Sequence, residues 1–326
     1  MNYPAHRFCV APMMDWTDRH CRFFHRQLSK RARLYTEMIT APALAHGDVP
    51  RHLDFHPAEH PVALQLGGSD AGELARAARL GERWGYDEIN LNCGCPSERV
   101  QTGSFGACLM REPVLVAQCV AAMRDAVSVP VTVKHRIGLD AEEDYGFVRD
   151  FVGTLAAAGC EVFIVHARNA VLKGLSPKEN REIPPLRYER VRWLKRDFPA
   201  LTFVLNGGLT QIDAIAAELG PVDGAMVGRA AYHDPYLLAQ VDRALFGADA
   251  APPSRAEVVR AMIEYASVEV GRGVPLRAIA RHVLGLYHGR SRGRIFRQLL
   301  SDAARLRDND IGLLQKAVAV VEPASR

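Results

Sequence analysis

The chain has 326 residues, 48% of them hydrophobic, with a formal net charge of +4 at pH 7, and its length suits a barrel of about 250 residues followed by a smaller unit. Its seven cysteines are an odd number and include no Cys-x-x-Cys pair, so the sequence disfavours a disulfide framework and a structural metal and favours a reducing cytoplasm. No uncharged run approaches the roughly 18 residues of a membrane span, and residues 1–7 lack the apolar core of a signal peptide, so we expect no membrane attachment.

Short apolar runs recur through the first 230 residues, and we expect eight strands, at 8–14, 34–39, 62–66, 88–92, 131–136, 162–166, 203–206 and 224–227. Stretches of helical period separate most of them, at 71–84, 114–126, 145–158 and 186–198. This alternation predicts an α/β fold, a (β/α)8 TIM barrel over residues 1–246. A doubly wound sheet is the alternative, but no Gly-x-Gly-x-x-Gly motif follows an early strand.

The first apolar run ends in Pro12, Met13 and Met14, and a helix cap follows at Thr17 or Asp18. Methionine pairs commonly fill gaps in a core. At the carboxyl end of a strand, the same side chains would form a soft apolar wall against a flat ring. The residues alone support these two interpretations evenly.

Two features surround the third strand and the loop after the fourth. Gln65 precedes a Gly-Gly pair, and Ser69 or Asp70 would cap the next helix. A solvated loop position is the commoner role of such a glutamine, but its amide can both donate to and accept from the edge of a heterocycle. The glycine-rich residues 101–107 form either a long connection or a mobile lid before a helix near Pro113.

The most informative stretch of the chain is residues 88–97. Ile89 and Leu91 alternate with two asparagines, which is typical of a half-buried strand, and a Gly-Cys-Pro turn ends the run. Cys95 therefore lies at the carboxyl end of a strand, where barrel enzymes have their active sites. An isolated cysteine is more often a small buried hydrophobe, but the flanking residues favour a functional thiol here.

A lysine interrupts the strand expected at 131–136. Lys134 is in phase with Thr132 and Arg136 and out of phase with the valines. Because a lysine inside a strand of β-branched residues is costly unless paired, we favour a functional role. His166 ends the next strand, so it would lie at the same end of the barrel as Lys134.

Glycines follow the last two predicted strands, in Asn206-Gly207-Gly208 and in Gly228-Arg229. Bare backbone amides and a helix amino end at these strands form the phosphate site that this fold commonly uses, and Arg229 would add a bidentate charge. The loop at 173–185, rich in charge and proline, would lie on the same rim as Cys95. It is either a solvated loop or a contact for a large substrate.

The end of the chain has a different composition. Periodicity is interrupted at 247–254, and four amphipathic stretches then predict a small helical bundle domain over residues 247–326, with helices at 255–272, 275–287, 295–306 and 312–321. This part carries thirteen Lys plus Arg against eight Asp plus Glu, and residues 281–307 hold seven arginines with one acid. A solvated helix face would balance its charges better, so we favour a nucleic acid backbone as the partner.

A phosphorylated, flat, polar-edged cofactor fits this inventory, and flavin mononucleotide (FMN) fits best, because Lys134 would stabilise the negative charge of its reduced ring. The sequence also resembles the transfer RNA dihydrouridine synthases, and within them the A subfamily, over almost the whole chain. The resemblance rests on the motifs Ala11-Pro12-Met13-Met14-Asp15, Leu91-Asn92-Cys93-Gly94-Cys95-Pro96-Ser97, Val133-Lys134-His135-Arg136, Val165-His166-Ala167-Arg168, Leu175-Ser176-Pro177-Lys178-Glu179-Asn180, Asn206-Gly207-Gly208 and Gly228-Arg229.

The resemblance implies reduction of the uracil C5=C6 bond in D-loop uridines of tRNA, at positions 20 and 20a. NADPH would reduce FMN, hydride would go to C6, and Cys95 would protonate C5. Cys93 departs from the family pattern, in which a small apolar residue is commoner. The implied FMN contacts are Pro12, Met13, Met14, Gln65, Lys134, His166, Asn206, Gly207, Gly208, Gly228 and Arg229. The implied tRNA contacts are Asn92, Lys178, Glu179, Arg181, Glu182, Arg294 and Arg297.

Two rival functions remain at this point. An FMN barrel that reduces a free pyrimidine or an enoate would share the cofactor site, but it would not need the basic carboxyl-terminal bundle. An RNA chaperone with incidental catalysis would need the bundle but no flavin. We expect a monomer, although no pattern in the sequence decides the oligomeric state.

Overall fold

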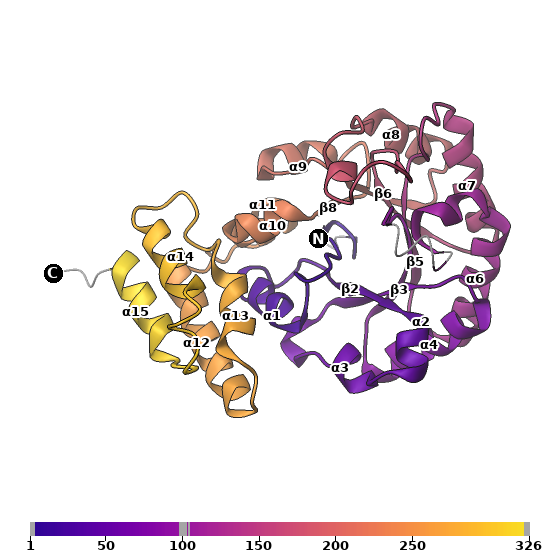
Figure 1. Cartoon of the computed structure of the whole chain (residues 1–326). Coiled ribbons are helices and arrows are strands. Elements are labelled where there is room, and N and C mark those ends of the chain that lie inside the picture. Colours follow the sequence, from indigo (N-terminus) through magenta and orange to yellow (C-terminus); the bar gives the residue numbers. More distant parts are fainter. Residues whose placement is uncertain (1–3, 98–102, 104, 323–326) are drawn as a thin grey trace.

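The computed structural model describes residues 4–97, 103 and 105–322, and its sheet has eight parallel strands in the order β1-β8-β7-β6-β5-β4-β3-β2. A parallel bridge between Cys9 and Arg33 joins the two ends of this order and closes the barrel (Figure 1). The (β/α)8 TIM barrel is therefore confirmed. Its strands are β1 (Phe8–Val10), β2 (Leu34–Thr40), β3 (Val62–Gly67), β4 (Glu88–Cys93), β5 (Val131–Arg136), β6 (Val162–His166), β7 (Thr202–Asn206) and β8 (Gly224–Val227).

Helices connect the strands and cover the outside of the barrel. Asp18 caps the first of them by accepting the backbone N–H groups of His20 and Cys21, and Asp70 caps α4 in the same way, as predicted. The barrel helices are α1 (Arg19–Leu28), α2 (Ala41–His46), α3 (Val49–Leu53), α4 (Ala71–Trp84), α6 (Pro113–Ala126), α7 (Tyr145–Ala157), α8 (Tyr188–Asp197), α9 (Ile212–Glu218), α10 (Arg229–His233) and α11 (Leu238–Phe246), with 3-10 turns η1 (Pro57–Glu59), η2 (Gly106–Arg111), η3 (Glu179–Arg181) and η4 (Pro235–Leu237).

One predicted strand is too long. The first apolar run was expected to continue to residue 14, but β1 ends at Val10. Ala11 still donates its N–H to the Val227 carbonyl at 2.8 Å, and Pro12 then has no N–H with which to continue the ladder. The other strands differ from the expected bounds by at most one residue.

The two faces of the strands pack differently. Ile89, Leu91 and Cys93 belong to the large apolar core between the strands and the helices. The barrel interior holds a small apolar cluster, made of Cys9, Ala11, Tyr35, Ala63, Ile164, Val204 and Met226. Buried polar side chains of β3, β4 and β5 lie on the same inner face, and hydrogen bonds join Gln65, Asn90 and Thr132.

Four further helices follow the barrel: α12 (Arg255–Gly271), α13 (Leu276–Val283), α14 (Gly293–Ser301) and α15 (Gly312–Val321). The connection begins where Gly247 ends α11 in a left-handed conformation, and it ends at Ser254, which forms a capping box with Glu257. α13 ends at Val283 rather than at residue 287, because the next residues form tighter turns, in which the Leu286 N–H donates to the Val283 carbonyl and the His288 N–H to the Gly285 carbonyl. α14 ends at Ser301 rather than at residue 306, because Asp302 is extended. Among the described helices, none is long and apolar enough to span a membrane.

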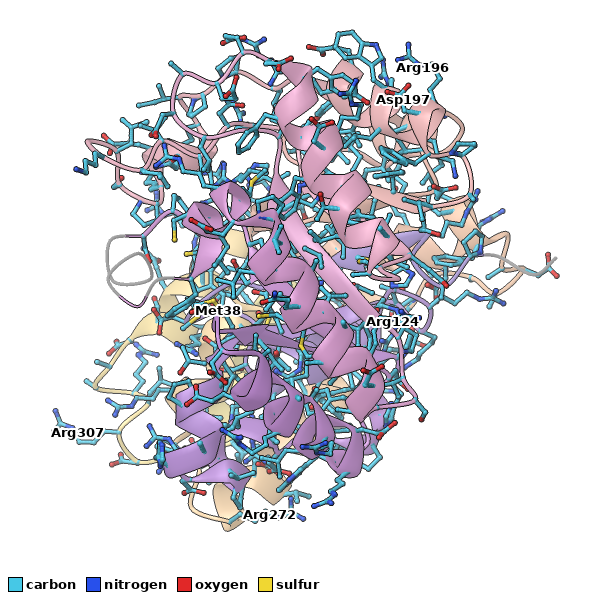
Figure 2. The ribbon with its side chains drawn as sticks, turned by 90° about the vertical axis from the view of Figure 1, so that its right-hand side faces the viewer. Met38, Arg124, Arg196, Asp197, Arg272 and Arg307 are labelled. Atoms are coloured by element: carbon cyan, nitrogen blue, oxygen red, sulfur yellow. The ribbon has the colours of Figure 1, made fainter. Side chains whose placement is uncertain are left out.

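The helical C-terminal part packs on α1, on the side of the barrel opposite α6 and α7 (Figure 1). Asp18 forms ion pairs with Arg281 and His282 of α13. Tyr265 of α12 stacks on Phe23 with ring centroids 3.9 Å apart. Viewed from the side of α6 and α7, Arg272 and Arg307 project from the periphery of the helical part, as Arg196 and Asp197 project from α8 (Figure 2).

Candidate active site

Three amides form a connected row inside the barrel mouth. Gln65 Nε2 donates to Asn90 Oδ1 at 2.7 Å, and Asn92 Nδ2 donates to Gln65 Oε1 at 2.8 Å. Gln65 is only 1% exposed, so it lies beneath the rim rather than in a solvated loop. Its position is fixed by both neighbours, and one amide hydrogen remains for a ligand.

The Cys95 thiol lies directly after this row, at the end of β4. Asn92 Oδ1 accepts the backbone N–H groups of Gly94 and Cys95, both at 3.0 Å, and so shapes the turn. The half-buried Cys95 thiol contacts Ser97 Oγ at 3.6 Å. Cys93 is fully buried on the opposite face, and burial raises its pKa well above the ordinary value, so a labelling reagent would reach Cys95 before Cys93.

Lys134 extends into the barrel from β5, as its phase predicted. Its half-buried amine donates to Asn206 Oδ1 at 3.0 Å, and within the described part of the chain it forms no ion pair with a carboxylate. Burial lowers the pKa of Lys134 to about 7, and the nearby Arg136 guanidinium contributes to this lowering. The mouth therefore contains an amine that would gain a proton readily beside an electron-rich ligand.

Arg136 lies next to this amine and is 3% exposed. Its Nε donates to the Gly94 carbonyl at 3.0 Å, and its Nη1 donates to the carbonyls of Asn180 at 3.0 Å and Asn169 at 3.3 Å. Arg136 thus joins the turn that carries Cys95 to the segment after β6. A planar guanidinium is well suited to bridging several carbonyls in this way.

His166 and the glycines after β7 lie across the mouth from β4. His166 pairs with Asn206 in the strand register, and burial with the Arg136 and Lys134 charges keeps its pKa well below the ordinary value, so the imidazole is neutral at pH 7. Gly207 has φ of 117°, and a Cβ at this position would lie 2.8 Å from the His166 ring. Only glycine fits there without displacing His166. Tyr188 donates its hydroxyl to the Gly207 carbonyl.

Arg229 follows Gly228 as the first residue of α10. It forms an ion pair with Glu182 and donates to the Arg181 carbonyl at 3.3 Å. A predicted cofactor residue therefore contacts two residues that were predicted to bind RNA.

The loop after β1 forms one wall of the mouth. Pro12 and Met13 are half-buried, whereas Met14 is 56% exposed, so Met14 does not fill a core gap. The Met13 N–H is bonded to Thr17 Oγ1 at 2.9 Å, and Asp15, at φ of 63°, donates its N–H to the Glu37 carboxylate. These bonds fix the loop in a shape that packs Met13 against the core beside Gly228 and leaves Met14 exposed.

The loop at 173–185 lies beside the Cys95 turn. Lys178, Glu179, Arg181 and Glu182 are exposed, while Asn180 is buried and donates to the Val171 and Leu175 carbonyls. A cleft of about 390 Å³ separates Ser97 from Gly174, Leu175, Ser176 and Pro177. Of the predicted lid at 101–107, residues 101, 102 and 104 lie outside the described residues, whereas Gly106 and Ala107 begin η2. No described group of three or more His, Cys, Asp or Glu side chains could hold a metal ion.

Comparison with known proteins identifies the family. The model of the family described as dihydrouridine synthase (Dus) matches residues 9–322. The chain belongs to the dihydrouridine synthase family. Three similar proteins are named tRNA-dihydrouridine(20/20a) synthase. The one from Xanthomonas campestris pv. campestris is 57% identical over 91% of this chain and 88% of its own length. The one from Pseudomonas putida is 55% identical over 98% of this chain and 95% of its own length, and the one from Salmonella typhimurium is 54% identical over 98% of this chain and 96% of its own length. Dihydrouridine synthases are flavin-dependent oxidoreductases.

For a dihydrouridine synthase, most of the predicted site residues are where the sequence expected them, at the carboxyl ends of the strands. Asn92, Lys134, His166 and Asn206 come from four consecutive strands. In register, Asn92 pairs with Lys134 and His166 pairs with Asn206, whereas Lys134 pairs with Ile164, two residues before His166. Arg294 and Arg297 are instead exposed on α14, away from the barrel mouth (Figure 1). Their roles, like those of the other site residues, stay predictions.

Several residues that shape this dihydrouridine synthase site were not singled out from the sequence. Asn90 and Arg136 had a usable signal, because each is in phase with a predicted site residue on its own strand. Asn180, through its carbonyl, and Glu37 and Tyr188, through their side chains, contact other segments of the chain. No local pattern could have revealed those contacts.

Proposed function

We propose that this protein reduces uridines 20 and 20a in the D loop of tRNA to 5,6-dihydrouridine, with FMN as cofactor and NADPH as reductant. The observation that carries this proposal is a half-buried thiol, Cys95, at the end of a barrel strand beside the Lys134 amine, which bonds to an amide oxygen. The names of the relatives supply the substrate and the two positions. Since tRNA is the substrate, we infer a cytoplasmic enzyme, and we take it to be a monomer.

The donor groups of the mouth fit FMN. Amide, imidazole and amine groups can meet the polar edge of its ring, methionines can contact its face, and glycine amides with an arginine can hold its phosphate. When bound and reduced by NADPH, FMN supplies the hydride that adds to C6 of uracil. The residues that would hold it are Pro12, Met13, Met14, Gln65, Lys134, His166, Asn206, Gly207, Gly208, Gly228 and Arg229.

Cys95 would supply the proton to C5. Among the described residues its sulfur is hydrogen-bonded to Ser97 Oγ. As a general acid, the thiol would give its proton to the substrate carbon. The bonds from Asn92 to the backbone of Gly94 and Cys95 would keep the sulfur in place.

The RNA would contact both parts of the protein. A base stacked in folded tRNA must turn out into the mouth before it can react. Residues 247–326 would form the helical tRNA-binding domain that holds the RNA meanwhile. The proposed contacts are Asn92, Lys178, Glu179, Arg181 and Glu182 on the barrel and Arg294 and Arg297 on the helices.

Dihydrouridine mapping tests this proposal. In tRNA from cells that lack the protein, positions 20 and 20a should remain uridine, and expression of the wild-type chain should restore the modification. Purified Cys95→Ala should keep its yellow flavin but turn over about 10²–10⁴-fold more slowly, the range for loss of a general acid.

Near-normal turnover by Cys95→Ala would remove Cys95 from the mechanism. Equal activity on free uracil and on tRNA would favour a small-molecule reductase. A purified protein that binds tRNA but never binds flavin would favour an RNA chaperone.

A further inference from the structure

A second set of hydrogen bonds continues the row of amides from the barrel mouth down to the amino ends of the strands. Asn90 Nδ2 donates to Thr132 Oγ1 at 2.8 Å, and Thr132 Oγ1 donates to Glu88 Oε1 at 2.6 Å. Together with the bonds to Gln65 and Asn92, this forms one chain from the Glu88 carboxylate to the backbone of Cys95. All its side chains are at most 9% exposed.

The direction of this chain is fixed from both ends. At the top, the N–H groups of Gly94 and Cys95 can only donate, so Asn92 must present its oxygen to them and its NH₂ to Gln65. At the bottom, the ionised Glu88 can only accept, so Thr132 must donate to it and accept from Asn90. Both ends assign the same orientation to all three amides.

The surroundings of Glu88 keep its carboxylate ionised, so that it can only accept hydrogen bonds. Tyr35 donates to its Oε1 at 2.7 Å, and on Oε2 it is paired with His6 at 2.7 Å and Arg33 at 3.1 Å. Burial alone would raise the pKa of Glu88, but the charges of His6 and Arg33 outweigh it and hold the pKa below its ordinary value. The carboxylate is therefore ionised at neutral pH.

We propose that Thr132 and Asn90 are positioning residues, which transmit the fixed acceptor at Glu88 to the Gln65 and Asn92 amides and so hold the turn that carries Cys95. Because each amide bonds to the next, one amide group cannot rotate by 180°, exchanging its oxygen and nitrogen, unless the other two rotate as well. A reversed row would point the Asn92 NH₂ at the two backbone N–H groups and release the turn. This role depends on the proposed function in one respect, which is that Cys95 is the general acid.

Hydrogen exchange at the Gly94 and Cys95 amides of the FMN-loaded enzyme tests the proposal. Thr132→Val has nearly the same shape but removes the hydroxyl link, and it should accelerate exchange at both amides by about tenfold, as expected for the loss of one buried hydrogen bond. Thr132→Ser keeps the hydroxyl and should exchange like the wild type. The matched control is Tyr35→Phe, which removes another hydroxyl from the same Glu88 oxygen but leaves the chain intact.

Unchanged exchange in Thr132→Val, or equal acceleration in Tyr35→Phe, would overturn the proposal. Should Thr132→Val not fold, Asn90→Leu cuts the chain one link nearer to Cys95 and must show at least the same acceleration. In turnover, Thr132→Val should lower kcat about tenfold with KM for tRNA unchanged, and Thr132→Ser should restore it. If the exchange pattern is found in an enzyme that does not reduce tRNA, the proposed function fails while the positioning role stands.

Discussion

The two ends of the barrel interior have opposite arrangements of charge. At the amino ends of the strands, the Glu88 carboxylate is surrounded by His6, Arg33 and two hydroxyl donors. At the carboxyl ends, the cations of Lys134 and Arg136 face amide and carbonyl oxygens, and no carboxylate among the described residues pairs with them. One end is balanced within the protein and stabilises the fold, whereas the other needs an electron-rich ligand to balance it.

The largest effect on stability should come from the balanced end. Glu88→Gln leaves the Arg33 guanidinium buried without its counter-charge, so we expect a loss of about 3–5 kcal/mol in the free energy of unfolding. Urea denaturation measures this loss. Glu264→Gln, which changes an exposed carboxylate on α12, is the control and should change stability by less than about 0.5 kcal/mol. Equal losses in both variants would contradict the contrast between the two ends.

The unbalanced end should respond in the opposite way. Lys134→Met removes a half-buried cation that pairs with no described carboxylate, so the apoprotein should lose no stability. Turnover should nevertheless fall about 10²–10³-fold, the cost of removing one donor that stabilises developing negative charge. Stopped-flow kinetics with tRNA and urea denaturation of the same variant separate the two effects. A Lys134→Met protein with lower stability and normal turnover would show that Lys134 serves the stability of the fold rather than catalysis.

The affinity for FMN should depend on pH through the same lysine. In the free protein the pKa of Lys134 is about 7. An anionic ligand favours the protonated amine and raises that pKa, so affinity should be constant below pH 7 and fall by up to about tenfold per unit as pH rises above it. Titration of the apoprotein with FMN between about pH 7 and 9 measures this slope. Lys134→Met should remove the slope, and a slope that persists would point to another group.

The smallest effect concerns the exposed cations of α14. The double variant Arg294→Gln/Arg297→Gln should bind tRNA more weakly and lower the salt slope of binding by about 2, since each phosphate that a side chain no longer neutralises lowers it by about 0.9. Arg196→Gln, on the far surface of the barrel (Figure 2), is the control and should leave the slope unchanged. An unaltered slope in the double variant would place the RNA elsewhere.

The sequence predicted the architecture well because the barrel repeats one simple pattern eight times. Strand periodicity located β5, β6 and β8 to the residue, and capping chemistry located the starts of α1 and α4. It failed at the end of β1, where Pro12 ends the ladder, and at the carboxyl ends of α13 and α14, where tight turns and an extended Asp302 replace the helical geometry that periodicity indicated.

The site was only half predictable for a related reason. Lys134 and Cys95 have clear sequence signals, because Lys134 interrupts a strand of β-branched residues and Cys95 lies in a Gly-Cys-Pro turn at the end of a strand. Arg136 is equally important to the geometry, but its bonds go to carbonyls of Gly94, Asn169 and Asn180, which carry no side-chain signature. Contacts between a side chain and a distant backbone are set by the tertiary fold and leave no periodic trace in the sequence.

The contact between α1 and the last four helices has a consequence for selectivity. The Asp18 pairs with Arg281 and His282, and the stack of Tyr265 on Phe23, fasten α12 and α13 to the barrel before any RNA arrives. Under the proposed function, the distance from the RNA contacts of α14 to the Cys95 sulfur is then constant. The enzyme would select the reacting nucleotide by its distance from the part of the RNA that α14 binds, without base-specific contacts to the neighbouring nucleotides.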